Sequence, residues 1–209
     1  MKLIYIYGCL GSMARRYRAI LEHLGHEWAG EDLDGQHGGF RLRQADAVII
    51  ATPTDTHMGL IRQLIDIGKP VLCEKPIMRQ ADALGGLRAL MADVVRAGMS
   101  LQMVSQYDHL VTAGGSGETR YDYWRSGPDG LAWDCLQIVR HAVDVPTLRN
   151  KSPMWDCTIN GQRLSIADMD GAYFLEIRNW LAAPRNDVSR ILESHEKVAS
   201  LEASWSRGS

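Results

Sequence analysis

Residues 2–25, KLIYIYGCLGSMARRYRAILEHLG, decide the fold. Their first part, LIYIY at 3–7, is rich in β-branched and aromatic side chains, which predicts a short strand. Gly8, Gly11 and Ser12 then interrupt the run, and residues 13–24 carry apolar side chains at helical spacing. A strand that turns through glycines directly into a helix is typical of a parallel α/β sheet.

The same alternation of strands and helices continues along the first half of the chain. Residues 47–51 (AVIIA) are almost wholly apolar, as in a strand that is buried on both faces of a parallel sheet. Further strands are expected at 26–32, 71–73 and 99–107, and further helices at 58–67 and 80–97. We therefore predict that residues 1–112 form a Rossmann-type, doubly wound α/β domain.

A smaller α+β unit is expected over residues 113–209, beginning at the glycine-rich stretch AGGSG. Asn160-Gly161 lies between two apolar-patterned segments, and this dipeptide favours a β-hairpin turn. Two or three strands are expected in this unit: two are predicted at 154–159 and 163–166, and the aromatic-rich segment 119–124 precedes them. The predicted helices are 133–143, 167–182 and 187–203.

Composition and charge narrow the range of functions. The 209 residues are 45% apolar and 23% charged, as in ordinary globular proteins. With 23 Lys and Arg against 25 Asp and Glu, the net charge is −2, so no overall positive field attracts nucleic acid or an anionic membrane. The four cysteines form no CxxC pair, so no metal centre is predicted. Because no signal peptide or membrane span is evident, we expect a soluble cytoplasmic protein.

The glycine turn is a candidate site for the pyrophosphate of a dinucleotide. Backbone N–H groups and the positive end of the helix dipole meet where a strand turns into a helix, and small residues let phosphates approach closely. The candidate residues are Gly8, Gly11, Ser12 and Met13. Ala14 takes the helix-packing position that a third glycine or an alanine normally fills.

Asp32 is the candidate for binding the adenosine ribose. It ends the second predicted strand 21 residues after Gly11, near the offset of about 20 at which an acidic residue accepts hydrogen bonds from ribose hydroxyls. Asp34 is its rival, and a plain strand connection with a solvated aspartate is the alternative for the whole feature. Asp32 favours NAD whereas nearby arginines favour the phosphate of NADP, so the cofactor stays open between NAD and NADP.

The stretch 46–76, DAVIIATPTDTHMGLIRQLIDIGKPVLCEKP, resembles the glucose-fructose oxidoreductase and inositol dehydrogenase family, Gfo/Idh/MocA. The family pattern is an apolar strand followed by TP, a polar pair and His, and then a helix and GK-hydrophobic-EKP. Here the pattern reads Thr52-Pro53-Thr54, His57, Gly68-Lys69 and Glu74-Lys75-Pro76. The resemblance also includes the glycine turn.

This resemblance implies a cofactor site and a catalytic lysine. Thr52, Pro53, Thr54 and His57 are expected to lie along the dinucleotide, and Glu74, Lys75 and Pro76 beside the nicotinamide. A lysine amine that is desolvated there suits proton exchange with a substrate hydroxyl while a hydride moves to the cofactor. The alternatives are that Lys75 is a surface lysine after an edge strand and that His57 bonds only to backbone.

The resemblance is incomplete in the second half of the chain. Family enzymes present an Asp and, four residues later, a His on one helix face, whereas here Asp134 is followed by Ile138. Asp134 is therefore either a second catalytic residue or a carboxylate favoured by a helix N-terminus. The family's large second sheet covers the active site and often pairs subunits, so the shortened unit is the expected place for substrate contacts or homo-oligomer formation.

These observations predict an oxidoreductase that depends on NAD or NADP. It would transfer a hydride between the nicotinamide and a hydroxyl or carbonyl group of a sugar-like small molecule. The alternative is a dinucleotide-binding or interaction protein derived from this family that has lost catalysis, and Ile138 favours that alternative.

Overall fold

The computed structural model describes residues 1–32, 39–79, 84–110, 117–123, 147–150 and 156–205. The chain divides into two compact units. The first, called the sheet domain below, consists of Met1–Val104 and Ile177–His195, and the second consists of Ser105–Glu176 and Glu196–Ser209. The sheet domain thus includes a segment far along the chain, while the division at residue 112 remains a prediction.

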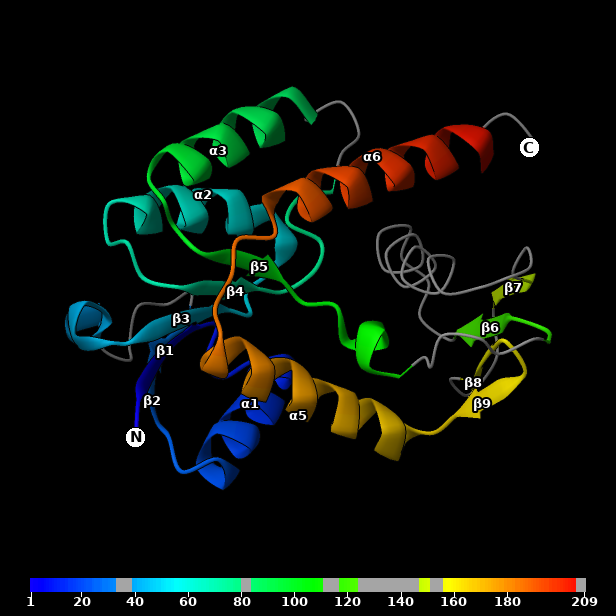
Figure 1. The fold of residues 1–209 in the computed structure, drawn as a ribbon, viewed down its shortest axis with the longest axis horizontal. Helices are drawn as coiled ribbons and strands as arrows, with labels where there is room; N and C mark the ends of the chain where they lie inside the picture. The colour runs from blue at the N-terminus through cyan, green and yellow to red at the C-terminus, as the bar shows by residue number, and fades with distance from the viewer. Residues whose placement is uncertain (33–38, 80–83, 111–116, 124–146, 151–155, 206–209) are drawn as a thin grey trace. The chain divides into compact units, whose positions relative to one another are not determined.

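A five-stranded parallel sheet forms the centre of the sheet domain (Figure 1). Its order is β2-β1-β3-β4-β5, and every neighbouring pair is parallel. The four residues of β3 are all buried, as the apolar run predicted. This arrangement confirms the Rossmann-type, doubly wound sheet. The strands are β1 (Leu3–Tyr7), β2 (Glu27–Glu31), β3 (Ala47–Ile50), β4 (Val71–Cys73) and β5 (Leu101–Met103).

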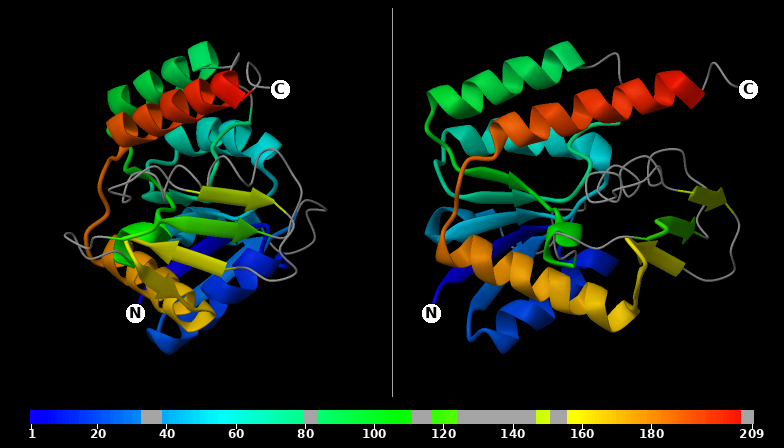
Figure 2. Two further views of the ribbon diagram at one scale, coloured as in Figure 1. Left: turned by 90° about the vertical axis from the view of Figure 1, so that its right-hand side faces the viewer. Right: turned by 45° about the vertical axis from the view of Figure 1, so that its right-hand side comes forward.

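Helices cover both faces of this sheet (Figures 1 and 2). Helix α1 (Ser12–His23) lies on one face, and α2 (Thr54–Ile65) and α3 (Leu84–Arg96) lie on the other. A short 3-10 helix, η1 (Gly39–Gln44), precedes β3. Helix α2 begins at Thr54, four residues earlier than predicted. Pro53 is the residue before the helix and has an extended backbone, so the chain enters the first helical turn directly after it.

Two long helices late in the sequence each contribute residues to the sheet domain. They are α5 (Ile166–Ala182) and α6 (Val188–Trp205), close to the predicted bounds. Between them, the backbone N–H of Asp187 donates to the Leu101 carbonyl at 2.9 Å, and the Asn186 side-chain amide donates to the Met99 carbonyl at 2.9 Å. The segment between α5 and α6 is therefore bonded to the edge strand β5.

The second unit contains a four-stranded sheet of order β7-β6-β8-β9. The predicted hairpin at Asn160-Gly161 is confirmed, with φ of 51° and 80° at the two residues, as a tight two-residue turn requires. Strand β7, which pairs in parallel with β6, was not predicted. The strands are β6 (Arg120–Tyr123), β7 (Thr147–Asn150), β8 (Asp156–Ile159) and β9 (Gln162–Leu164).

One predicted strand is shorter in the structure, and one predicted helix falls outside the described residues. The strand expected at 99–107 is shorter, because the chain leaves β5 after Met103 and forms a 3-10 helix, η3 (Gln106–His109). The helix expected at 133–143 lies outside the described residues. Within the described part of the chain, no helix has both the length and the apolarity to cross a membrane.

Candidate functional site

The predicted site segments follow four strands of the same parallel sheet. The glycine turn follows β1, Asp32 follows β2, Thr52–His57 follow β3, and Glu74–Pro76 follow β4. Because all these strands are parallel, their carboxyl ends lie at one edge of the sheet. The winding of the sheet reverses between β1 and β3, which is where open α/β sheets bind ligands.

Gly8 fits this edge because it has no side chain. Its φ is 78°, and a Cβ built there would lie 2.8 Å from the Ala51 carbonyl oxygen. Its backbone N–H donates to the Glu31 carbonyl at 2.8 Å. The ends of β1, β2 and β3 therefore converge on Gly8, and any other residue would force them apart.

Asp32 is tied directly to the glycine turn. Its carboxylate accepts a hydrogen bond of 3.1 Å from the backbone N–H of Leu10. Gly11 is the residue before α1, while Ser12 and Met13 open the helix. Ala14 is fully buried, as a helix-packing position requires. The turn, the helix start and the acidic residue form one continuous structure.

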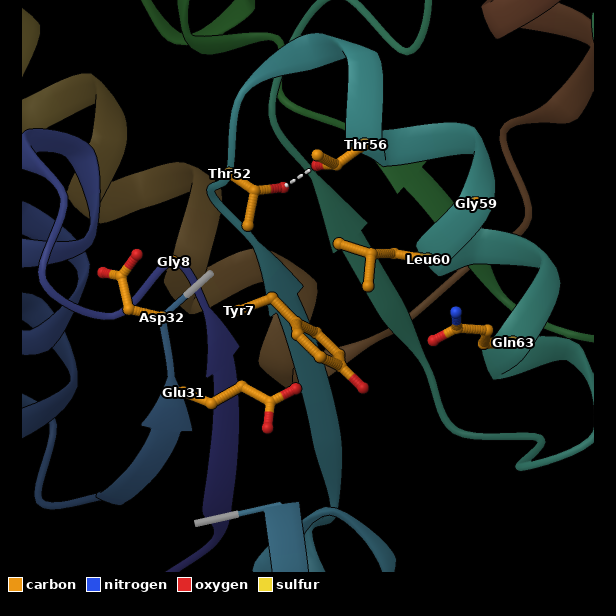
Figure 3. A pocket seen from close by; sticks show the side chains of 9 residues that line it. All are labelled: Tyr7, Gly8, Glu31, Asp32, Thr52, Thr56, Gly59, Leu60 and Gln63. Carbon is orange, nitrogen blue, oxygen red and sulfur yellow. Dashed lines mark hydrogen bonds between the residues drawn. The ribbon is translucent and has the colours of Figure 1, made fainter. Parts of the chain in front are cut away.

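A pocket of about 340 Å³ opens at this edge of the sheet (Figure 3). Three predicted site residues line it: Gly8, Asp32 and Thr52. The other lining residues were not predicted, and four of them come from α2 at positions i, i+3, i+4 and i+7, a spacing that marks one helix face. These further residues are Tyr7, Glu31, Thr56, Gly59, Leu60 and Gln63.

The charge of this pocket is negative. Of the described residues that line it, Glu31 and Asp32 are acidic and none is basic. Burial, and then the nearby Glu31 carboxylate, raise the pKa of the Tyr7 hydroxyl. Carboxylates accept hydrogen bonds from sugar hydroxyls and repel a phosphate, so the pocket suits a free ribose diol.

Thr52 presents a hydrogen-bond acceptor to the pocket. The Thr56 hydroxyl donates to the Pro53 carbonyl at 2.8 Å, and the hydroxyls of Thr52 and Thr56 are 2.6 Å apart (Figure 3). A hydroxyl has one proton to donate, so the proton between the two threonines comes from Thr52. The remaining capacity of the Thr52 oxygen is to accept.

The segment Glu74–Pro76 is anchored by its neighbours. Glu74 is 8% exposed, and its carboxylate accepts hydrogen bonds from the Tyr17 hydroxyl on α1 and from the Lys75 backbone N–H. Lys75 itself is half-buried, and Pro76 is buried. None of these three residues lines the pocket described above, so their place beside a nicotinamide remains a prediction.

The ring nitrogens of His57 contact backbone carbonyl groups, which is the alternative that the sequence left open for this residue. Its side chain is 1% exposed, with Nε2 2.8 Å from the Thr52 carbonyl oxygen and Nδ1 2.8 Å from the Pro76 carbonyl oxygen. Burial lowers the pKa of His57, against the opposing effect of the two carbonyl groups. Because a neutral imidazole carries one N–H, the ring donates to one of these two carbonyl oxygens and only contacts the other; it lies between two of the predicted cofactor segments.

The remaining candidates belong to other segments of the chain. Asp134, Ile138 and Asp34 lie outside the described residues. Among the residues that are described, no group of three or more His, Cys, Asp or Glu side chains is arranged to hold a metal ion.

The described residues fit the adenosine and pyrophosphate parts of a dinucleotide. A backbone cradle at Gly8 excludes any Cβ, and Asp32, Glu31 and Thr52 offer oxygen acceptors to hydroxyl groups. The pocket's size lies in the range of about 300–1,000 Å³ that is common for small-molecule sites.

Comparisons with known proteins agree with this geometry. A family described as "Oxidoreductase family, NAD-binding Rossmann fold" matches residues 7–99. An inositol 2-dehydrogenase of Rhodococcus erythropolis is 34% identical over 67 residues, which are 32% of this chain and 19% of that protein. An inositol 2-dehydrogenase of Rhizobium meliloti is 44% identical over 48 residues, 23% of this chain and 14% of that protein. The matches thus span less than a fifth of either relative.

Solved structures share the fold. A Gfo/Idh/MocA family oxidoreductase from Vibrio cholerae has a TM-score of 0.70 at 12% identity, covering 100% of this chain and 99% of the other. The WlbA (WbpB) dehydrogenase of Thermus thermophilus, solved with NAD and UDP-GlcNAcA, has a TM-score of 0.62 at 14% identity, covering 96% and 94%. At these identities the likeness concerns the fold alone.

Proposed function

We propose that this chain, whose residues 7–99 match the NAD-binding Rossmann domain of the Gfo/Idh/MocA oxidoreductases, is an NAD-dependent oxidoreductase of that family. Its substrate is a secondary hydroxyl group, or the matching carbonyl group, of a cyclic polyol or sugar-like molecule. The observation that carries the proposal is the convergence of Gly8, Asp32 and Thr52 on one pocket at the carboxyl edge of the sheet.

The acidic pocket supports NAD rather than NADP. Glu31 and Asp32 both line it, and a 2′-phosphate would be held beside two carboxylates. That repulsion disfavours NADP, whereas a 2′-hydroxyl can donate to either carboxylate. The names of the two inositol 2-dehydrogenases and of the WlbA complex support a polyol or sugar substrate.

Each site residue has a defined role in this proposal. The backbone of Gly8–Met13 holds the pyrophosphate, and Asp32 with Glu31 accepts hydrogen bonds from the ribose. The nicotinamide, when bound, supplies the acceptor or donor of a hydride. The Lys75 amine removes the hydroxyl proton of the substrate during oxidation and returns it during reduction, which is worth about 10²–10⁴ in rate.

The test is turnover with matched lysine variants. Wild type, Lys75→Met and Lys69→Met are incubated with NAD⁺ and myo-inositol, other cyclic polyols or UDP-sugars, and NADH formation is followed. Lys69 precedes β4 at the opposite end of the strand from Lys75, so its loss should leave turnover unchanged. Lys75→Met should lower kcat by about 10²–10⁴ with the Kd for NAD⁺ within about threefold.

Two outcomes would contradict this proposal. Equal turnover by wild type and Lys75→Met would remove Lys75 from the reaction. Tight binding of NAD⁺ without turnover on any of these substrates would favour the alternative, a dinucleotide-binding protein that has lost catalysis.

A cytoplasmic location and self-association through the C-terminal part belong to the same proposal. Cys9, Cys73 and Cys157 are buried free thiols, which supports a reducing compartment. Light scattering at several concentrations, on the full chain and on variants of the second unit's surface, tests the self-association.

A further inference from the structure

Three buried side chains from three helices hold the segment that carries Lys75. Tyr17 on α1 donates to the Glu74 carboxylate. His57 on α2 contacts the Pro76 carbonyl oxygen at 2.8 Å. His195 on α6 accepts a hydrogen bond of 3.4 Å from the Met78 backbone N–H. The residues on both sides of Lys75 are thus bonded to helices, and the contacts lie within the sheet domain.

His57 also contacts a second segment of the site. Its Nε2 lies 2.8 Å from the Thr52 carbonyl oxygen, and the Thr52 side chain lines the pocket. One imidazole ring therefore lies against both the segment after β3 and the segment after β4, and its single N–H in the neutral form bonds to one of them. With 1% of its side chain exposed, it is shielded from water and from a bound ligand.

The position of a lysine amine depends strongly on its backbone. The side chain is a flexible four-carbon stem, and Lys75 is only half-buried, so packing alone does not fix it. A displacement of about 1 Å at a catalytic group costs about 10²-fold in rate. Contacts to the backbone on either side of Lys75 are therefore one means by which this fold can set the amine's position.

We propose that His57 is a positioning residue for Lys75: its Nδ1–H donates to the Pro76 carbonyl, and this bond fixes the lysine backbone against the helix that also borders the pocket wall at Thr52. The role of Lys75 rests on the proposed function, whereas the contact between His57 and the Pro76 carbonyl does not. His57 touches neither cofactor nor substrate and acts through Pro76.

Two conservative variants separate the two contacts. In His57→Asn the amide nitrogen takes the place of Nδ1, so it keeps the contact with Pro76 and loses that with Thr52. In His57→Gln the amide nitrogen takes the place of Nε2, so it keeps the contact with Thr52 and loses that with Pro76. Both variants are polar and smaller than or similar in length to histidine, and each serves as the control for the other.

The readout is the NMR signal of Lys75 after reductive methylation with ¹³C-formaldehyde. The chain has five lysines, so five side-chain signals are expected, and Lys75→Arg identifies the signal of interest. Without cofactor, the Lys75 signal of His57→Asn should coincide with that of the wild type. In His57→Gln it should move toward the position of the exposed Lys197 and become narrower.

Kinetics provide a second readout. With a turned-over substrate, His57→Gln should lower kcat by about 10- to 100-fold with an unchanged KM for NAD⁺, and this loss should exceed that of His57→Asn. An identical Lys75 signal in wild type, His57→Asn and His57→Gln would overturn the inference. A Lys75 signal that does not respond to bound NAD⁺, while still separating the two variants, would instead contradict the proposed function.

Discussion

Replacing Gly8 by alanine should damage both the fold and the pocket, to a degree that the structure lets us calculate. At a φ of 78°, alanine costs about 1–2 kcal/mol relative to glycine. The new Cβ would also lie 2.8 Å from the Ala51 carbonyl oxygen, and overpacking of that kind adds about 1–3 kcal/mol. The unfolding free energy should therefore fall by about 2–5 kcal/mol, measured by urea denaturation.

Gly25→Ala is the matched control for Gly8→Ala. Gly25 has a φ of 73°, but a Cβ built there would meet nothing within 4 Å, and Gly25 lies outside the pocket. The Gly25→Ala variant should lose only about 1–2 kcal/mol of unfolding free energy, from the positive φ alone, and should keep its affinity for NADH. Gly8→Ala should lose at least about tenfold in that affinity, because the Ala51 carbonyl and Thr52 must shift. Equal destabilisation of the two variants, or wild-type affinity in Gly8→Ala, would refute the reasoning.

Two further predictions concern the buried polar groups. Tyr17→Phe removes the hydroxyl that donates to the buried Glu74 carboxylate and should lower the unfolding free energy by about 1.5–3 kcal/mol; a change below about 0.5 kcal/mol would show that this bond contributes little. Burial lowers the pKa of His195 to about 4, so stability should be full above pH 6.5 and fall by about 3 kcal/mol as the pH drops from 6.5 to 4, because only the unfolded chain binds the proton there. Urea denaturation across that range should show a weaker pH dependence in His195→Gln, and an unchanged slope would contradict the assignment.

The sheet domain was predictable because its signals are local. The apolar run at 47–51 and the glycine turn are set by the conformational preferences of neighbouring residues, and the same holds for the Asn160-Gly161 hairpin of the second unit. Asp32 was placed by its spacing alone, and the structure puts it in contact with the turn through Leu10. These features could be predicted because each depends on residues that lie close together in the sequence.

The missed features depend on contacts between distant residues. Nothing in the pattern of residues 181–187 indicates that Asp187 bonds to Leu101, and β7 pairs with β6 across a long connection. The pocket face of α2 was overlooked because Thr56, Gly59 and Gln63 are not apolar and give no periodic signal. Whether His57 contacts a cofactor or backbone likewise depends on where Pro76 lies in the folded chain.

A calorimetric titration of NADH and NADPH into the same wild-type protein tests the central claim most directly, because it asks whether the acidic pocket at the carboxyl edge holds a free ribose diol. We predict one site for NADH, at least about tenfold weaker binding of NADPH, and loss of that preference in a Glu31→Gln, Asp32→Asn double variant. Absence of binding at millimolar NADH, or equal affinities for the two dinucleotides, would contradict the account.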